Sequence, residues 1–228
     1  MMSCRGLNAP ALLRVLADPR SVADLRRYFG VELPHGLPAF TGGRFEQLGG
    51  GGDHPAVRDR ITSDDLIAVE MLSVHVPARV ALDLLEGALG REVATELRRI
   101  PTDVSLADTE APQYIKDGGP ADRAWRLLRN NGGVGWVTAG KLLARKRPRL
   151  VPVYDEVVRC AYRTGRGFWS CLHERLREDE GVLVDCLTRL HTEAALPPEI
   201  TTLRVLDVVF WMRHRDGHTG YRCRGLDG

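Results

Sequence analysis

Apolar residues recur three or four positions apart over most of this chain, which is the spacing of a helix buried along one face. Asp18-Pro19 breaks the period near the start, so two short helices are expected before residue 30. Between 31 and 54 the pattern fails, because prolines and the run Gly49 to Gly52 replace the apolar repeat. A long irregular connection is predicted there, either flexible or ready to hold a ligand.

Helical spacing returns at residue 62. Thr62 stands three positions before Asp65 and ahead of an apolar run, which is typical of a capping box at a helix start. Further helices are predicted after Val76-Pro77 and over 92–99, and another begins at Pro120. Later helices are predicted over 155–162, 168–177, 182–195 and 200–213. Alternating β-branched residues occur only briefly, at 150–153, so the predicted fold class is all-α.

These boundaries predict four regions. Residues 1–60 hold the first helices and the glycine-rich connection, and 61–119 form a helical lobe that ends in a turn-rich stretch after 101. Residues 120–215 form a second helical lobe, and 216–228 are expected to be a flexible tail because glycines and charges dominate it.

Composition narrows the partners little. The 228 residues are 43% hydrophobic and 27% charged, with a formal net charge of +2, so a nucleic-acid partner can be argued only from local clusters of charge. No apolar stretch is long enough to cross a bilayer and no secretory signal is present, so a cytoplasmic protein without a membrane partner is expected. The five cysteines form no metal-ligand spacing; reduced, mostly buried thiols, no metal and no cofactor are predicted.

The segment from Asn131 to Leu143 carries the clearest chemistry. A predicted helix ends at Asn131-Gly132, the chain turns through Gly133-Val134-Gly135, and another helix starts at once. Amides at such a helix start, together with the helix dipole, favour one phosphate group.

This segment resembles the helix-hairpin-helix motif, whose places are filled here by Gly133, Val134, Gly135, Thr138 and Ala139. Asp155 follows Gly133 by 22 positions, after an apolar stretch. That order resembles the helix-hairpin-helix DNA glycosylases, the endonuclease III and AlkA-like enzymes. The resemblance implies two helical lobes around a cleft, DNA as partner, and Asp155 beside a flipped nucleotide.

Asp155 has two compatible interpretations. A carboxylate near the anomeric carbon stabilises the positive charge that develops when an N-glycosidic bond breaks, so Asp155 is the catalytic candidate. Asp is also a favoured N-cap, here of a helix starting at Glu156. The lyase members carry a Lys directly before the Thr-Ala pair, where this chain has Val137, and the four-cysteine cluster of some members is missing. A monofunctional hydrolase without a Schiff-base Lys remains.

Lys141, Arg145, Lys146, Arg147 and Arg149 place five cations within nine positions, with no acid among them. Beside a phosphate-binding hairpin they predict contacts to a DNA backbone; the alternative is a solvated helix end whose cations favour the dipole. Three arginines, at 159, 163 and 166, would continue the positive surface.

Trp136 and Tyr154 are candidates for lining a base pocket, although either ring equally suits packing in the core. In the last helix Asp207 is predicted to be a buried acid paired with Arg204, with a carboxylate facing a cleft as the alternative.

Three longer segments resemble DUF6308, an uncharacterised actinobacterial family: Phe40 to Glu46, Gly135 to Pro148 and Leu203 to Met212. This resemblance implies no activity.

The leading hypothesis rests on the helix-hairpin-helix resemblance and is a DNA-binding helix-hairpin-helix protein that excises a base with Asp155. The alternatives are a non-catalytic DNA-binding module, or a scaffold adapted to a nucleoside or other metabolite.

Overall fold

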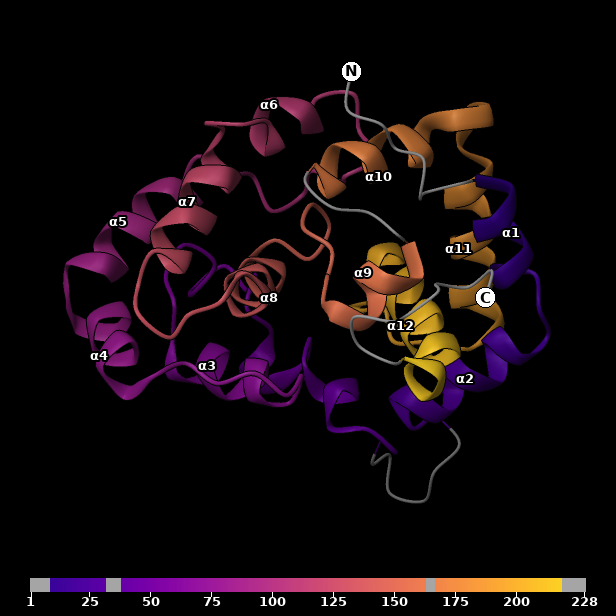
Figure 1. The fold of residues 1–228 in the computed structure, drawn as a ribbon, viewed down its shortest axis with the longest axis horizontal. Helices are drawn as coiled ribbons and strands as arrows, with labels where there is room; N and C mark the ends of the chain where they lie inside the picture. Colours follow the sequence, from indigo (N-terminus) through magenta and orange to yellow (C-terminus); the bar gives the residue numbers. More distant parts are fainter. Residues whose placement is uncertain (1–8, 32–37, 163–166, 219–228) are drawn as a thin grey trace. The chain divides into compact units, whose positions relative to one another are not determined.

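The computed structural model describes residues 9–31, 38–162 and 167–218. Helices dominate these ranges and no strand occurs in them, which confirms the all-α prediction (Figure 1). No helix in the described ranges is both long and apolar enough to cross a membrane. The helices are α1 (Ala9–Leu16), α2 (Arg20–Phe29), α3 (Ser63–Glu70), α4 (Ala78–Glu86), α5 (Ala88–Leu97), α6 (Ala111–Ile115), α7 (Pro120–Arg129), α8 (Trp136–Lys146), α9 (Glu156–Tyr162), α10 (Phe168–Arg177), α11 (Val182–Glu193) and α12 (Thr202–His214).

Local signals set several helix ends where the sequence predicts them. The Thr62 hydroxyl accepts a hydrogen bond from the Asp65 amide, and the Asp65 carboxylate accepts one from the Thr62 amide at 2.9 Å. This reciprocal pair is the capping box expected at the start of α3. Gly30 ends α2 in the left-handed conformation, at φ 73°, which glycine adopts without a Cβ clash.

The described chain divides into two compact units. Unit 1 joins the segment up to Ala39 to the segment from Val153 onward, and unit 2 runs from Phe40 to Pro152. The divisions that the sequence pattern predicts, after residues 60, 119 and 215, do not coincide with the boundaries of these units. Unit 1 groups the two ends of the chain because α1 and α2 pack on α11 and α12, a long-range pairing that no local pattern encodes.

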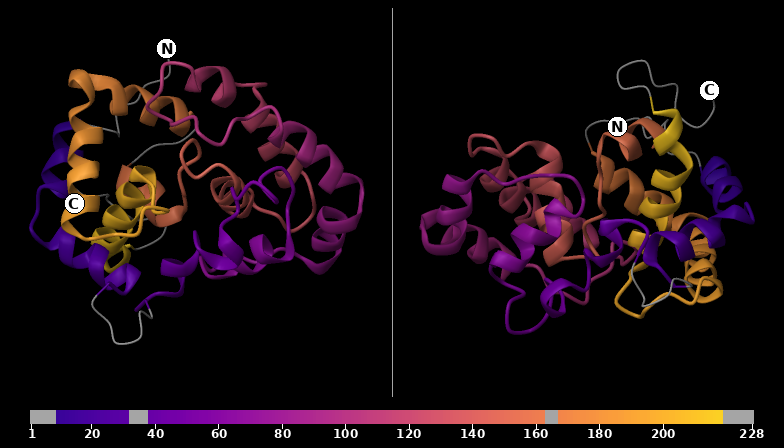
Figure 2. Two further views of the ribbon diagram at one scale, coloured as in Figure 1. Left: turned by 180° about the vertical axis from the view of Figure 1, so that it is seen from behind. Right: turned by 90° about the horizontal axis from the view of Figure 1, so that it is seen from below.

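The core of unit 1 is built around α12, whose residues from Leu203 to Phe210 are all buried. Inside this helix Arg204 pairs with Asp207 at 2.7 Å, and the Arg204 guanidinium also donates to the Tyr28 hydroxyl at 2.8 Å. The predicted buried Arg204–Asp207 pair is thus confirmed. α9 lies beside α12 in both Figures 1 and 2, and Tyr162 of α9 packs on Phe210.

Unit 2 is arranged around α8, on which α3 and α7 pack, while α5 packs on the far side of α7 (Figure 1). The apolar contacts come from side chains with no exposed area, including Val93, Leu97, Leu128 and Leu142. Every residue of α8 from Thr138 to Lys146 is buried. A helix enclosed in this way must find internal partners for its polar side chains.

The prediction of reduced cysteine thiols is only partly confirmed. Cys160 and Cys171 each take part in a disulfide bond, so the expectation of reduced thiols is wrong for these two residues, whereas Cys186 is free and buried. Disulfide pairing depends on which segments meet in space, and sequence spacing carries no signal for that.

The predicted flexible tail is only partly described. Asp216 and Gly217 belong to a 3-10 turn over Arg215–Gly217, and residues 219–228 lie outside the described residues.

Candidate nucleic-acid interface

The turn between α7 and α8 has the local geometry that the sequence predicts. Gly133 adopts φ 86°, the amide of Val134 donates to the Asn131 carbonyl at 3.0 Å, and Gly135 lies in the extended region before α8. The Val134 side chain is buried and fixes the turn to unit 2. A Cβ at Gly133 would lie 2.6 Å from Pro77, so this position needs glycine for space as well as for its conformation.

The outer side of this turn is open to solvent. Gly132, Gly133 and Gly135 are exposed, and their amides donate to no acceptor among the described residues. The first backbone bond of α8 runs from the Ala139 amide to the Gly135 carbonyl at 3.0 Å. Unused amides therefore coincide with the positive end of an eleven-residue helix, a combination that attracts an anion.

Aromatic side chains hold the turn from the inside. The Trp136 carbonyl accepts a hydrogen bond from the indole of Trp125 at 3.2 Å, and the Arg129 guanidinium lies 5.0 Å from the centre of the Trp125 ring. Trp136 itself is half-buried, so part of its ring area is exposed beside the turn. Thr138 and Ala139 are buried and pack inward.

Four of the five clustered cations do not face solvent. Lys141, Arg145, Lys146 and Arg147 are exposed by only 3%, 2%, 0% and 1%. The prediction of a solvent-facing basic surface is therefore wrong for these four, and only Arg149 is exposed. The Lys141 ammonium donates a hydrogen bond to the Leu72 carbonyl at 2.7 Å, and this bond joins α8 to the segment that follows α3.

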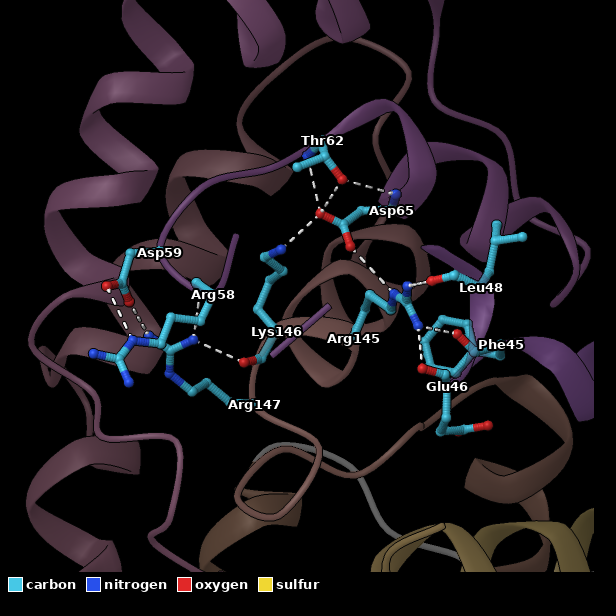
Figure 3. A network of polar contacts seen from close by, with 10 residues as sticks. All are labelled: Phe45, Glu46, Leu48, Arg58, Asp59, Thr62, Asp65, Arg145, Lys146 and Arg147. Carbon is cyan, nitrogen blue, oxygen red and sulfur yellow. Dashed lines mark hydrogen bonds and ion pairs between the residues drawn. The ribbon is translucent and has the colours of Figure 1, made fainter. Parts of the chain in front are cut away.

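Asp65 is the counter-ion for two of the buried cations (Figure 3). Its carboxylate accepts from the Lys146 ammonium at 2.7 Å and from the Arg145 guanidinium at 3.2 Å, and all three side chains are buried. Burial lowers the pKa of Lys146, and the adjacent Asp65 carboxylate opposes that shift. One acid that caps α3 therefore also neutralises the interior of the unit.

Backbone carbonyls provide the remaining partners. The Arg145 guanidinium donates to the carbonyls of Phe45, Glu46 and Leu48, so the 3-10 turns Thr41–Arg44 and Leu48–Gly50 wrap around it (Figure 3). A Cβ at Gly52 would lie 2.4 Å from the Arg145 carbonyl. The glycine run thus lets a loop approach a buried arginine closely.

Arg147 anchors another set of segments. Its guanidinium donates to the carbonyls of Ile100 and Arg58, each at 2.7 Å, and forms an ion pair with Asp59 at 2.7 Å. Burial lowers the pKa of Arg147, and Asp59 opposes the shift. Five N–H donors in a rigid plane suit arginine to such a site, where lysine would leave acceptors unpaired.

Asp155 belongs to unit 1 and begins α9. One carboxylate oxygen accepts from the amides of Val157 and Val158, each at 3.0 Å, which is N-cap geometry. The side chain is half-buried. The predicted cap is present, and catalysis by Asp155 stays a prediction. The neighbouring Tyr154 ring stacks on Phe168 with centroids 3.8 Å apart, so one face of that ring is used in packing.

The cations expected beyond Asp155 are only partly described. Arg159 is exposed and pairs with Glu156 at 3.0 Å, and residues 163 and 166 lie outside the described residues.

One group of side chains has the composition of a metal site. The Cys160 sulfur and one nitrogen each of His214 and His218 lie within 4.8 Å of one another. Zinc binds the thiolate of cysteine, and the sulfur of Cys160 is in a disulfide bond. No metal centre is assigned to this group. Burial, and to a smaller extent His218, lowers the pKa of His214.

The sequence predicts the turn between α7 and α8 but not the buried ion pairs. The Thr62-x-x-Asp65 spacing predicts a helix start, but it does not indicate that the Asp65 carboxylate pairs with Arg145 and Lys146, which lie 80 and 81 positions later. No short-range signal was available, because such pairs form only when α3 packs on α8.

Comparison with known proteins gives a family and no activity. No curated protein and no solved structure matches the chain. A family model described as a family of unknown function, DUF6308, matches residues 21–214. Since that match covers most of the chain, including the turn between α7 and α8 and Asp155, the protein belongs to the DUF6308 family.

Proposed function

We propose that this protein binds the phosphate backbone of DNA through the turn between α7 and α8, without base-specific contacts and without hydrolysis. The observation that supports the proposal is the exposed glycine turn, where amides with no acceptor in the described ranges meet the positive end of α8. A phosphate oxygen is a strong acceptor for such amides, and glycines let a strand approach the backbone closely.

Few cations support this contact. Arg129 and Arg149 are the exposed basic residues nearest in sequence to the turn and the end of α8, while the cations between them are buried. Each phosphate that a cation neutralises changes the slope of log affinity against log salt by about −0.9. A slope of about −2 is therefore expected, shallower than a patch of five cations would give.

The test uses the space around Gly135. This residue has φ −77°, which any residue adopts, and nothing lies within 4 Å of the Cβ that a substitution would add. Gly135→Glu places a carboxylate beside the turn, and Gly135→Gln is its neutral control of equal size. We expect the Glu variant to bind a duplex about tenfold more weakly than the Gln variant at low salt, measured by fluorescence anisotropy.

Equal affinity of the two variants would show that no phosphate approaches the turn. Neutralising Lys146 or Arg147 does not test the proposal, because both side chains are buried and hold the interior of unit 2 together.

Hydrolysis by Asp155 is the more specific alternative. We favour binding alone because one carboxylate oxygen of Asp155 already accepts two hydrogen bonds as the cap of α9. Asparagine caps helices about as well as aspartate, so Asp155→Asn preserves the fold while removing the charge. Incubation with a panel of damaged duplexes is expected to yield no abasic sites. Abasic sites that form with the natural chain and disappear in Asp155→Asn would establish a glycosylase instead.

A further inference from the structure

A second basic site lies in unit 2, away from the hairpin turn in sequence. A groove of about 390 Å³ is lined by the end of α4, by one face of α5 and by Arg60-Ile61. Its volume falls in the range of small-molecule sites, roughly 300 to 1,000 Å³.

One face of α5 supplies most of one wall. Arg91, Ala94, Thr95 and Arg98 line the groove at positions i, i+3, i+4 and i+7, which share a helix face. Gly90 lies where a Cβ would stand 2.1 Å from the Leu84 carbonyl, so α4 and α5 approach closely here.

The three groove arginines, Arg60, Arg91 and Arg98, have no acidic partner in the described part of the chain. All three are exposed, and none forms an ion pair with a described residue. The one hydrogen bond of Arg91 is a long contact, 3.5 Å, to the Glu86 carbonyl. The adjacent Arg99 differs, because it pairs with Glu96 at 3.7 Å. Three cations therefore face one acid in the lining, Glu86, and leave an excess of positive charge.

Apolar residues also line the groove. Ile61, Leu84 and Ala94 are nearly fully buried, so Leu85, which is 42% exposed, is the most accessible apolar side chain of the lining. The amide of Leu89, in the first turn of α5, is already taken by the Asp83 carboxylate at 3.2 Å. The arginines, and not this helix start, are therefore the groups available to an anion.

From the exposed arginines, the accessible Leu85 and the volume, we infer that this groove binds a small molecule that joins a phosphate group to an apolar or aromatic body, such as a nucleoside monophosphate. Arg91 and Arg98 hold the phosphate by charge-assisted hydrogen bonds, and Leu85 contacts the ring system. A DNA strand offers the same phosphate chemistry, but the volume of the groove suits one nucleotide and not a duplex.

Adenosine monophosphate is the probe, with adenosine, inorganic phosphate and a duplex as comparisons, each titrated into the full chain by calorimetry. The test variant is Arg91→Gln/Arg98→Gln. Arg99→Gln is the matched control, next to Arg98 in sequence and outside the groove lining. Because a hydrogen bond to a charged group contributes about 1.5 to 3 kcal/mol, each lost arginine should weaken binding roughly tenfold or more.

We expect adenosine monophosphate to bind at least about tenfold more tightly than adenosine, to lose that advantage in the double variant and to keep it in Arg99→Gln. Gly135→Glu should leave this affinity unchanged, so the groove and the DNA proposal can fail separately. Equal binding of nucleotide and nucleoside, or an unchanged affinity in the double variant, would overturn the inference. So would a double variant that affects duplex binding alone, because the arginines would then belong to a DNA surface.

Discussion

Unit 2 contains two sets of cations that differ in every respect except charge. Lys141, Arg145, Lys146 and Arg147 lie within seven positions of the sequence and are buried. The three groove arginines are spread over 39 positions, from 60 to 98, and all are exposed without an acidic partner among the described residues. The dense set holds the interior together, and the dispersed set faces a cavity. Density of charge along a chain is therefore a poor guide to charge on a surface.

The difference follows from the cost of removing a charge from water. A buried cation needs a counter-ion or several acceptors, and the dense set has Asp65, Asp59 and the carbonyls of several loops. The helix end that carries these cations also favours positive charge through its dipole. The groove arginines remain hydrated and need no such partners.

The largest expected effect comes from removing the shared counter-ion. Asp65→Asn leaves the Arg145 and Lys146 charges buried without a carboxylate, and we expect it to lower the free energy of unfolding by about 3 to 5 kcal/mol. Urea denaturation measures this. Asp64→Asn is the control, because Asp64 is the residue before Asp65 and its side chain is exposed. This substitution should change the free energy of unfolding by less than about 0.5 kcal/mol. Similar effects of the two substitutions would mean that the network is not a stabilising feature.

A smaller loss is expected when the charge stays and the guanidinium is removed. Arg147→Lys keeps one cation for Asp59 but cannot reach the carbonyls of Ile100 and Arg58 together, so we expect a loss of about 2 kcal/mol in the same assay. The exposed Arg149→Lys should be within about 0.5 kcal/mol of the natural chain. If Arg147→Lys were also neutral, charge alone and not hydrogen bonding would explain why this arginine is buried.

The smallest effect is expected in the groove. Arg91→Gln/Arg98→Gln should leave the free energy of unfolding within about 0.5 kcal/mol, because these side chains are exposed and the hydrogen bond of Arg91 to the Glu86 carbonyl is long, at 3.5 Å. A small gain would fit relief of repulsion among like charges. A large loss would show that the groove arginines are structural like those of α8, and the contrast between the two sets would disappear.

Parts of the candidate site were predictable because local rules govern them. The glycine turn needs a positive φ at Gly133, Thr62 and Asp65 form a capping box, and Asp155 caps α9. Each of these features joins residues two or three positions apart. Arg204 and Asp207 likewise meet because three positions on a helix bring side chains together.

Other parts could not be predicted because distant segments decide them. The glycine run at 49–52 suggested a flexible or ligand-ready loop, but it wraps Arg145. The cysteine spacing predicted free thiols, yet Cys160 and Cys171 each take part in a disulfide bond. The groove could not be predicted from the sequence, because Arg60 lies about 30 positions before Arg91 and joins it only when the chain folds.

The amino-acid sequence by itself determined the helices, their caps and the hairpin turn, because hydrogen bonds and apolar spacing within a few residues suffice for these. Only the tertiary structure decided which charges are buried and which are exposed. That outcome depends on whether packing brings a carboxylate such as Asp65 to a cation, and contacts across 80 positions are set by the fold as a whole.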